Sequence, residues 1–178
     1  MPDKERAKRV ILEIVHLSGG ELTGTTRLYK AFYFAHLYFA EGASGYLTDW
    51  PIVKMPNGPG IHSCEVLVAE LIAEGFLQKD HVPVGPFLAV RYRATGGAPS
   101  GDPLPDPAVQ AIQRAAQLVD DKSAWELTDL THQFSRSWNS AREGEELNIY
   151  VDLIPDDEYE ARQARLNQTQ QLLDAAWQ

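Results

Sequence analysis

The strongest hydrophobic pattern in the chain runs from Leu28 to Ala40 and reads LYKAFYFAHLYFA. Eleven of these 13 residues are apolar or aromatic, and only Lys30 and His36 interrupt them. A helix that is hydrophobic almost all round is buried on every side or spans a membrane, and 13 residues are too few for a bilayer, which needs ~20. We therefore expect the buried central helix of a soluble domain, in which Lys30 and His36 each need a partner, access to water or a function.

Apolar positions at helical spacing predict further elements on either side of this helix. The first helix covers residues 4–18 and ends at Gly19–Gly20. Thr23 or Thr25 is expected to cap the central helix, which runs to about Glu41. After it we expect a short strand over residues 52–54, a turn over residues 56–60 and a helix over residues 61–74.

A β-hairpin should come next, because a Pro/Gly-rich turn is followed by an arm in which Leu88, Val90 and Tyr92 alternate with their neighbours. Its arms are residues 76–81 and 87–93, joined by a turn over residues 82–86. Two helices followed by a hairpin is the order of a winged helix. The sequence therefore predicts a mainly α fold of the α+β class: a helical domain around a central buried helix, with a small winged-helix-like β-hairpin.

Residues 94–106 are rich in Gly and Pro and are expected to form a flexible loop. Asp106 should cap the next helix with Pro107 at its first position, and a capping box of Ser123 and Glu126 should open another. Beyond that helix we expect irregular chain after Gln133, an anchor at Trp138 and an extended piece over residues 147–153.

The chain is expected to divide into one helical domain, residues 1–153, and a terminal helix within residues 154–178. That helix carries a narrow apolar seam: Tyr159, Leu166, Leu173 and Trp177. The seam can pack back on its own domain, or it can pair with a partner or with a second copy as a short coiled coil, making a homodimer.

Composition narrows the classes of function. The chain has 178 residues and a formal net charge of −9, which disfavours general nucleic-acid binding because affinity for phosphates comes largely from Lys and Arg. The single cysteine, Cys64, lies on an apolar helix side, so we expect a buried, unreactive thiol. No segment resembles a signal peptide or a membrane span, which predicts a cytoplasmic protein that does not bind a membrane.

DNA binding through a winged helix would use the helix before the hairpin. Base edges and phosphates require Arg, Lys, Asn or Gln there, but this helix carries Glu65, Glu70 and Glu74 and no Lys or Arg. The hairpin adds a small basic patch of Lys79, Arg91 and Arg93. Nucleic-acid binding is therefore an alternative function that the sequence disfavours.

Catalytic motifs are missing from the sequence. The five histidines have no metal-binding spacing, and His62 and Cys64, two residues apart on a helix, point in different directions. We expect no catalytic residues, no metal and no cofactor, and therefore a protein that is not an enzyme. An enzyme of an unrecognised type is the second alternative.

Two polar clusters need an explanation. Lys30, Tyr33 and His36 follow one another at a spacing of three and so share one stripe of the central helix. His36 is either a satisfied interior histidine or part of a site. Thr131 and His132 end a later helix, where His132 either bonds the last carbonyls or belongs to the same site.

These residues resemble the SocA-like antitoxin family, also called the Panacea domain. The segment from Tyr29 to His36 is similar to the family's signature helix, which typically reads Lys-Leu-Leu-Tyr-Phe-Ala-His. Lys54 followed by Gly58 and Pro59 before a helix resembles its second block. Its third block is matched in order by Leu127, Leu130, Thr131, His132, Trp138, Ala141 and Arg142. The similarity covers roughly residues 8–150.

The resemblance implies a mainly helical domain from bacteria or their phages. Some members of the family are antitoxins that neutralise a toxin encoded beside them, at least one type is an adaptor that delivers its toxin to a protease, and the family is not known for enzymatic activity. For this chain the resemblance implies a protein partner, namely a cognate toxin. Lys30, Tyr33 and His36 are then expected to face His132 and Arg142 across the core, as a structural network or as a pocket for a toxin segment or small ligand.

Overall fold

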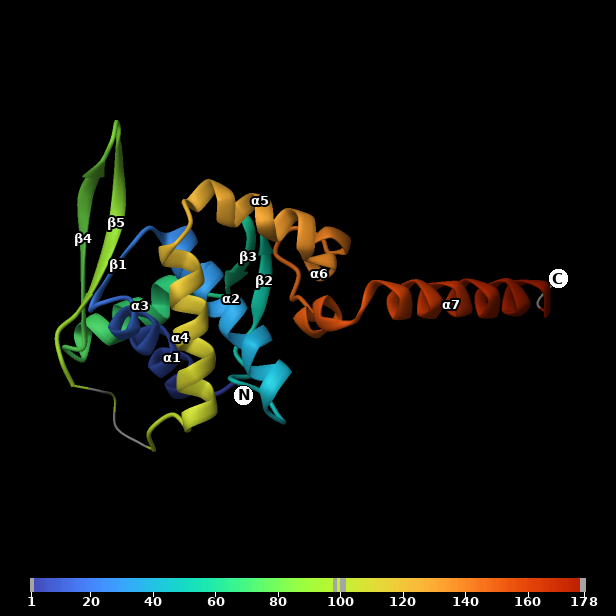
Figure 1. The fold of residues 1–178 in the computed structure, drawn as a ribbon, viewed down its shortest axis with the longest axis horizontal. Coiled ribbons are helices and arrows are strands. Elements are labelled where there is room, and N and C mark those ends of the chain that lie inside the picture. The colour runs from blue at the N-terminus through green and yellow to red at the C-terminus, as the bar shows by residue number, and fades with distance from the viewer. Residues whose placement is uncertain (1, 98, 100–101, 177–178) are drawn as a thin grey trace.

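The apolar run forms helix α2 (Thr25–Gly42), which lies at the centre of the domain (Figure 1). The structure is a computed structural model that describes residues 2–97, 99 and 102–176. Ten residues of α2 are buried, Lys30 and His36 among them. Around it pack α1 (Lys4–Leu17), strand β3 (Gly58–Ile61), α4 (Asp106–Asp120), α5 (Ala124–Phe134) and the 3-10 helix η1 (Ile149–Leu153). The predicted central helix and the predicted first helix are both confirmed.

The start of α2 differs from the prediction. Its N-cap is Gly24, at φ +105°, and neither Thr23 nor Thr25 caps it. The Gly24 amide donates to the carbonyl of Val90, and the Gly24 carbonyl accepts from the amide of Leu28. Backbone pairing with a distant strand therefore decides where the helix begins, and a positive φ requires glycine at that position.

The hairpin is confirmed as β4 (Leu77–Val84) and β5 (Phe87–Ala94), with a turn of only Gly85 and Pro86. A third strand, β1 (Glu21–Thr23), pairs antiparallel with β5 and gives the order β1-β5-β4. The sequence did not predict β1, because three residues are too few for a periodic pattern. Helix α3 (Cys64–Ala73) directly precedes the β4–β5 hairpin along the chain, as predicted (Figure 1).

A second hairpin lies between α2 and α3. The predicted strand is β2 (Ile52–Met55), but residues 58–61, expected in a turn and a helix, form its partner β3. Only Pro56 and Asn57 make the turn. Helix α3 consequently starts at Cys64 and not at Ile61.

The second half of the domain is more helical than expected. The capping box of Ser123 and Glu126 is confirmed at the start of α5. The N-cap of α4 is Pro105, so Asp106 and Pro107 lie one position further into the helix than predicted. Two predictions are wrong: a short helix, α6 (Arg136–Ser140), replaces the irregular chain, and the 3-10 helix replaces the extended piece over 147–153.

The predicted flexible loop over residues 94–106 lies partly outside the described residues. Two carbonyls of its described part, those of Pro99 and Asp102, accept hydrogen bonds from the guanidinium of Arg9 on α1. The loop is thus tied to the body at these points, while its flexibility stays a prediction.

The last helix, α7 (Asp156–Ala176), projects away from the body (Figure 1). Its first turn touches the domain through Arg136, which pairs with Asp156 and lies 4.6 Å from the Tyr159 ring centroid. Residues 160–175 are exposed, so the prediction that this helix packs on its own domain is wrong. Its pairing with another chain stays a prediction. Trp177, the end of the predicted seam, lies outside the described residues.

The fold class is confirmed as mainly α within the α+β class, with seven α-helices and two small sheets in the part of the chain that the structure describes. Among those residues, no helix combines the length and the apolar character needed to cross a bilayer.

Among the described glycines, Gly58 is the one at which an added Cβ would make the shortest contact. Its φ is +104°, and a Cβ there would lie 2.1 Å from Lys30 Nζ and 2.7 Å from Thr131 Oγ1. We expect Gly58→Ala to lower the free energy of unfolding by about 2–4 kcal/mol, through strain and overpacking together. Denaturant unfolding measures it. Gly96→Ala is the control, because Gly96 has a similar φ of +95° and open space around it, so strain alone acts there; equal losses in both variants would contradict the prediction.

Candidate functional site

Lys30 is a buried lysine with one polar partner. Its side chain is 1% exposed, and Nζ donates to the carbonyl of Asn57 at 2.5 Å. The bond joins the centre of α2 to the β2–β3 turn, and it explains why Gly58 must lack a side chain: Nζ occupies the space where a Cβ would stand. A cavity of about 210 Å³ borders Lys30, Tyr29 and the same turn.

The ammonium group of Lys30 has no carboxylate partner among the described residues. Burial in an apolar helix disfavours the charged form, and it lowers the pKa of Lys30 to about 7. Two of the segments that resemble the antitoxin family, Tyr29–His36 and Gly58–Pro59, thus meet where Lys30 Nζ lies beside Gly58.

Tyr33 belongs to a different cluster. Its hydroxyl donates to Asp152 Oδ2 at 2.6 Å, and the same carboxylate accepts from the amide and hydroxyl of Ser137 and from the hydroxyl of Ser135. Asp152 is 4% exposed. Four donors satisfy the buried carboxylate. Through these hydrogen bonds Asp152 of the 3-10 helix links α6 to Tyr33 of α2. Burial, and then the charge of Asp152, raise the pKa of Tyr33 and keep its hydroxyl protonated.

His36 is a satisfied interior histidine. Its Nδ1 lies 2.8 Å from the carbonyl of Phe32, and its Nε2 lies 3.1 Å from Thr48 Oγ1. A carbonyl only accepts, so Nδ1 must carry the proton, and Nε2 must accept from the hydroxyl of Thr48. Thr48 Oγ1 accepts in turn from the amide of Trp50. Burial lowers the pKa of His36 to about 4, so the ring is neutral at pH 7.

His132 and Trp138 form an aromatic pair at the surface end of α5. Their ring centroids lie 4.1 Å apart and the planes differ by 11°. Trp138 Nε1 donates to the carbonyl of Met55 at 2.8 Å, which confirms this residue as an anchor. Lys54 Nζ lies 4.3 Å from the Trp138 ring centroid and donates to the carbonyl of Ala141. His132 does not bond the last carbonyls of α5, and its buried Nε2 has no hydrogen-bond partner among the described residues.

The expected arrangement across the core is therefore wrong. Lys30, Tyr33 and His36 make three separate contacts, because a spacing of three turns each side chain about 60° from the previous one. Thr131 lies beside the Lys30 contact. Arg142 is exposed and lies outside all three. Pro59 is buried within β3, opposite Lys54 in the neighbouring strand.

Two carboxylates, Glu70 of α3 and Glu74 at its C-cap, bind lysines of α1. Glu74 accepts from Lys8, a lysine of α1 that is 1% exposed, and Glu70 pairs with Lys4 and Lys8. Burial alone would lower the pKa of Lys8, but hydrogen bonds to Glu74 and Glu5 raise it above its usual value. The predicted recognition helix thus uses two of its carboxylates for packing against α1.

The basic patch of the hairpin is largely paired. Arg91 binds Asp80 through two nitrogens, at 2.7 and 3.0 Å, and Arg93 binds the same carboxylate at 3.1 Å. These bonds hold the pKa of Asp80 below its usual range. Lys79 is exposed.

The described residues contain no group of three or more His, Cys, Asp or Glu that could hold a metal ion. Cys64 is free and buried, as predicted, and burial raises the pKa of its thiol to about 12. The chemistry that these contacts support is hydrogen bonding and packing. Sequence reasoning missed Asp152 and Lys8, because a lone Asp or Lys carries no signal until the chain folds around it.

No protein-family model, no curated protein and no solved structure matches this chain.

The Tyr33–Asp152 bond is expected to be a main stabiliser of the core. Tyr33→Phe removes a hydrogen bond to a buried carboxylate and should lower the free energy of unfolding by about 1.5–3 kcal/mol. Tyr29→Phe is the matched control: Tyr29 lies on the same helix and is partly buried, and its hydroxyl has no hydrogen-bond partner in the described part of the chain. Tyr29→Phe should lower the free energy of unfolding by no more than about 0.5 kcal/mol. Chemical denaturation of both variants measures the difference, and similar losses would refute the assigned role.

The burial of Lys30 should appear as a pH dependence of stability. The pKa of Lys30 is about 7 in the fold, against 10.5 for a lysine in water, so the unfolded chain binds more protons above pH 7. Stability should therefore rise with pH, by at most ~1.4 kcal/mol per pH unit from this group. Unfolding is to be compared between pH 7 and 8.5, below the range in which the unfolded tyrosines ionise; the Cys64 thiol begins to ionise in the unfolded chain within this window, but it does so equally in the unmodified protein and in the variant. Lys30→Met should flatten the slope relative to the unmodified protein, and parallel curves would show that Lys30 keeps an ordinary pKa.

Proposed function

We propose that this chain is a non-enzymatic protein-binding module of the antitoxin type, which binds and neutralises a cognate toxin protein or delivers it as an adaptor. The observation that carries the proposal is α7, a helix of 21 residues that projects from the body with its leucines exposed. Leu166, Leu172 and Leu173 are 61%, 67% and 51% exposed. The resemblance to the SocA-like family supplies the kind of partner, and the cytoplasm is the compartment that the proposal assumes.

A helix without tertiary packing gains little stability from its own hydrogen bonds. In proteins most of the stability of a helix comes from tertiary packing of its apolar face, and α7 contains few stabilising ion pairs beyond Arg162 with Glu158. Apolar side chains on such a helix gain about 25 cal/mol per Å² when a partner covers them. An exposed helix with leucines at its far end is therefore well suited to fold against another protein.

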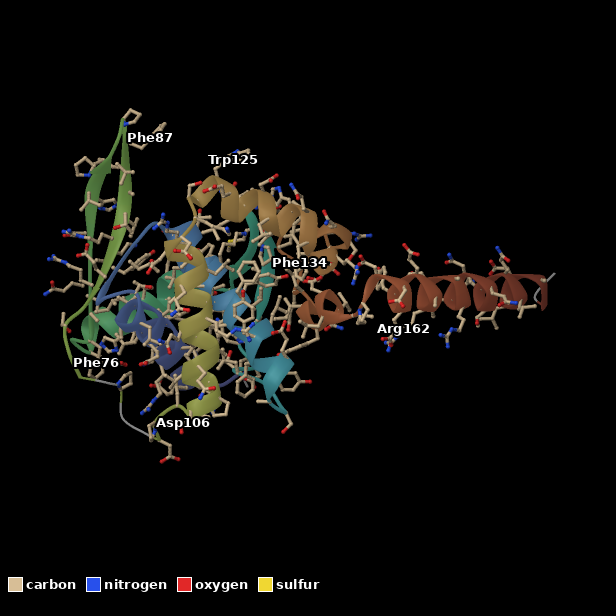
Figure 2. The ribbon with its side chains drawn as sticks, viewed as in Figure 1. Phe76, Phe87, Asp106, Trp125, Phe134 and Arg162 are labelled. Carbon is tan, nitrogen blue, oxygen red and sulfur yellow. The ribbon has the colours of Figure 1, made fainter. Side chains whose placement is uncertain are left out.

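The body of the protein also exposes apolar side chains. Phe87 stands at the tip of the β4–β5 hairpin and Trp125 in the first turn of α5 (Figure 2). Each is 74% exposed, as is Leu88 next to Phe87. Aromatic side chains are enriched at protein interfaces relative to the rest of the surface. They support a protein partner over a small molecule.

The alternative of nucleic-acid binding finds less support in the contacts. Phosphates need free Arg and Lys, whereas Arg91 and Arg93 already bind Asp80. Glu70 lies on the helix that would enter a groove, and Glu74 is its C-cap. The alternative predicts retention on DNA at low salt with a steep salt dependence, which an electrophoretic titration tests directly.

The experiment for the antitoxin type is co-expression. Each reading frame adjacent to the gene is expressed in a bacterial host, alone and with this protein, and growth and complex formation are measured. We expect one adjacent product to arrest growth, and this chain to restore growth and to co-purify with that product. If none of the adjacent products is toxic, or if the toxic one neither binds nor is neutralised, the antitoxin type is wrong.

The role of α7 has its own prediction. The triple variant Leu166→Gln, Leu172→Gln and Leu173→Gln should weaken partner binding at least tenfold. It should leave the thermal unfolding of the domain unchanged, because these side chains are exposed on a helix that projects from the body. The control triple Asn167→Ala, Gln168→Ala and Gln171→Ala changes polar positions of the same helix. Equal binding of both variants would contradict the prediction. Sedimentation of the protein alone measures whether a second copy covers the leucines.

A further inference from the structure

A cavity of about 450 Å³ lies between two segments that contain none of the residues named for the family resemblance. It is formed by the connection from α2 to β2 and by the chain from residue 146 to residue 150. Its floor includes His36, which is buried and held in its neutral tautomer by Phe32 and Thr48. Helix α2 therefore contributes one side chain, His36, to the cavity lining.

Three aromatic side chains line this cavity. The rings of Tyr46 and Tyr150 lie 5.3 Å apart between centroids, with their planes at 58°, so they form two walls of an angular trough. Trp50 adds an indole whose Nε1 donates to the carbonyl of His62 at 2.8 Å, which fixes the orientation of the ring. Tyr46 is 65% exposed, so its ring is open to a ligand.

The formal charges that described residues place in the cavity lining are both negative. They belong to Asp49 and Glu146, both exposed. Asp49 accepts one hydrogen bond from the amide of Asp3, and Glu146 forms no ion pair with any described residue. Arg6, whose Nε donates to the carbonyl of Leu47, is not part of the lining. The cavity therefore combines aromatic faces with uncompensated negative charge.

Aromatic faces attract cations through the ring quadrupole, and neighbouring carboxylates add a direct Coulomb attraction. We infer that this cavity binds the guanidinium or ammonium group of a basic side chain from a partner protein. The aromatic rings hold the apolar stem and the face of the cation, and Asp49 and Glu146 accept its N–H bonds. A volume of about 450 Å³ accommodates a whole arginine or lysine side chain. The net charge of −9 draws a basic partner to the protein in the first place.

This inference deepens the proposed function by naming the chemistry of the partner's contact, and it rests on that function only for the source of the side chain. The cavity itself is tested without a partner. The probes are the blocked tripeptide acetyl-Gly-Arg-Gly-amide, its lysine analogue, free arginine, and the neutral citrulline analogue of the arginine tripeptide. The ligands are titrated into the full chain, and chemical-shift changes of the backbone amides and of the Trp50 indole are followed by NMR.

We expect the arginine tripeptide to bind weakly, to shift resonances of residues 46–52 and 146–150, and to bind at least threefold tighter than the citrulline analogue. Glu146→Gln and Tyr46→Ala should each reduce the affinity by about three- to tenfold. Glu143→Gln is the matched control, because Glu143 is an exposed carboxylate close to Glu146 in the chain and does not line the cavity. This variant should bind the arginine tripeptide as tightly as the unmodified protein does.

Equal binding of the citrulline analogue, shifts confined to other parts of the surface, or no binding at tens of millimolar would each overturn the cation site. Tighter binding of free arginine than of the blocked tripeptide would overturn the assignment to a protein side chain, and would indicate a small-molecule cation instead. Failure of the proposed function gives a different result: no partner is found in co-expression, while the tripeptide still binds in the cavity.

Discussion

The fold depends on the burial of α2 on every side. An apolar helix in this position gains the hydrophobic free energy of its leucine, phenylalanine and alanine side chains, but each polar group that it carries must find a partner inside the protein. Lys30, Tyr33 and His36 find theirs on three different segments: the β2–β3 turn, the 3-10 helix and the connection before β2. These contacts decide how the surrounding elements attach to the central helix.

The same constraint separates the interior from the surfaces left for function. Lys30, Tyr33 and His36 of α2 have hydrogen-bond partners, Glu70 and Glu74 bind lysines of α1, and the arginines of the hairpin bind Asp80. What remains free is of a different kind: an exposed helix with leucines, a hairpin tip with Phe87, and a cavity with aromatic walls. All three surfaces suit contact with another protein. For this reason the resemblance to an antitoxin family and the pattern of exposure lead to the same proposed function.

The candidate site was only partly predictable. Residues that carry the resemblance do meet in space. Lys30, Gly58 and Thr131 lie together at one place. Lys54, His132 and Trp138 lie together at another. Their common arrangement across the core was wrong, because positions three apart on a helix meet different neighbours when the helix is surrounded. Asp152, which joins Tyr33 to two serines, had no signal in the sequence. A hydrogen-bond partner more than a hundred residues away is chosen by packing and not by local pattern.

The sequence by itself determined the elements whose signals are local. The apolar run of α2, the capping box of α5 and the alternation in β5 are properties of short segments, and each predicted its element. Only the tertiary structure decided the strands β1 and β3, the start of α2 at Gly24 and the exposure of α7. Short strands exist because a partner strand satisfies their backbone groups. The exposure of a helix, likewise, depends on what the rest of the chain leaves uncovered.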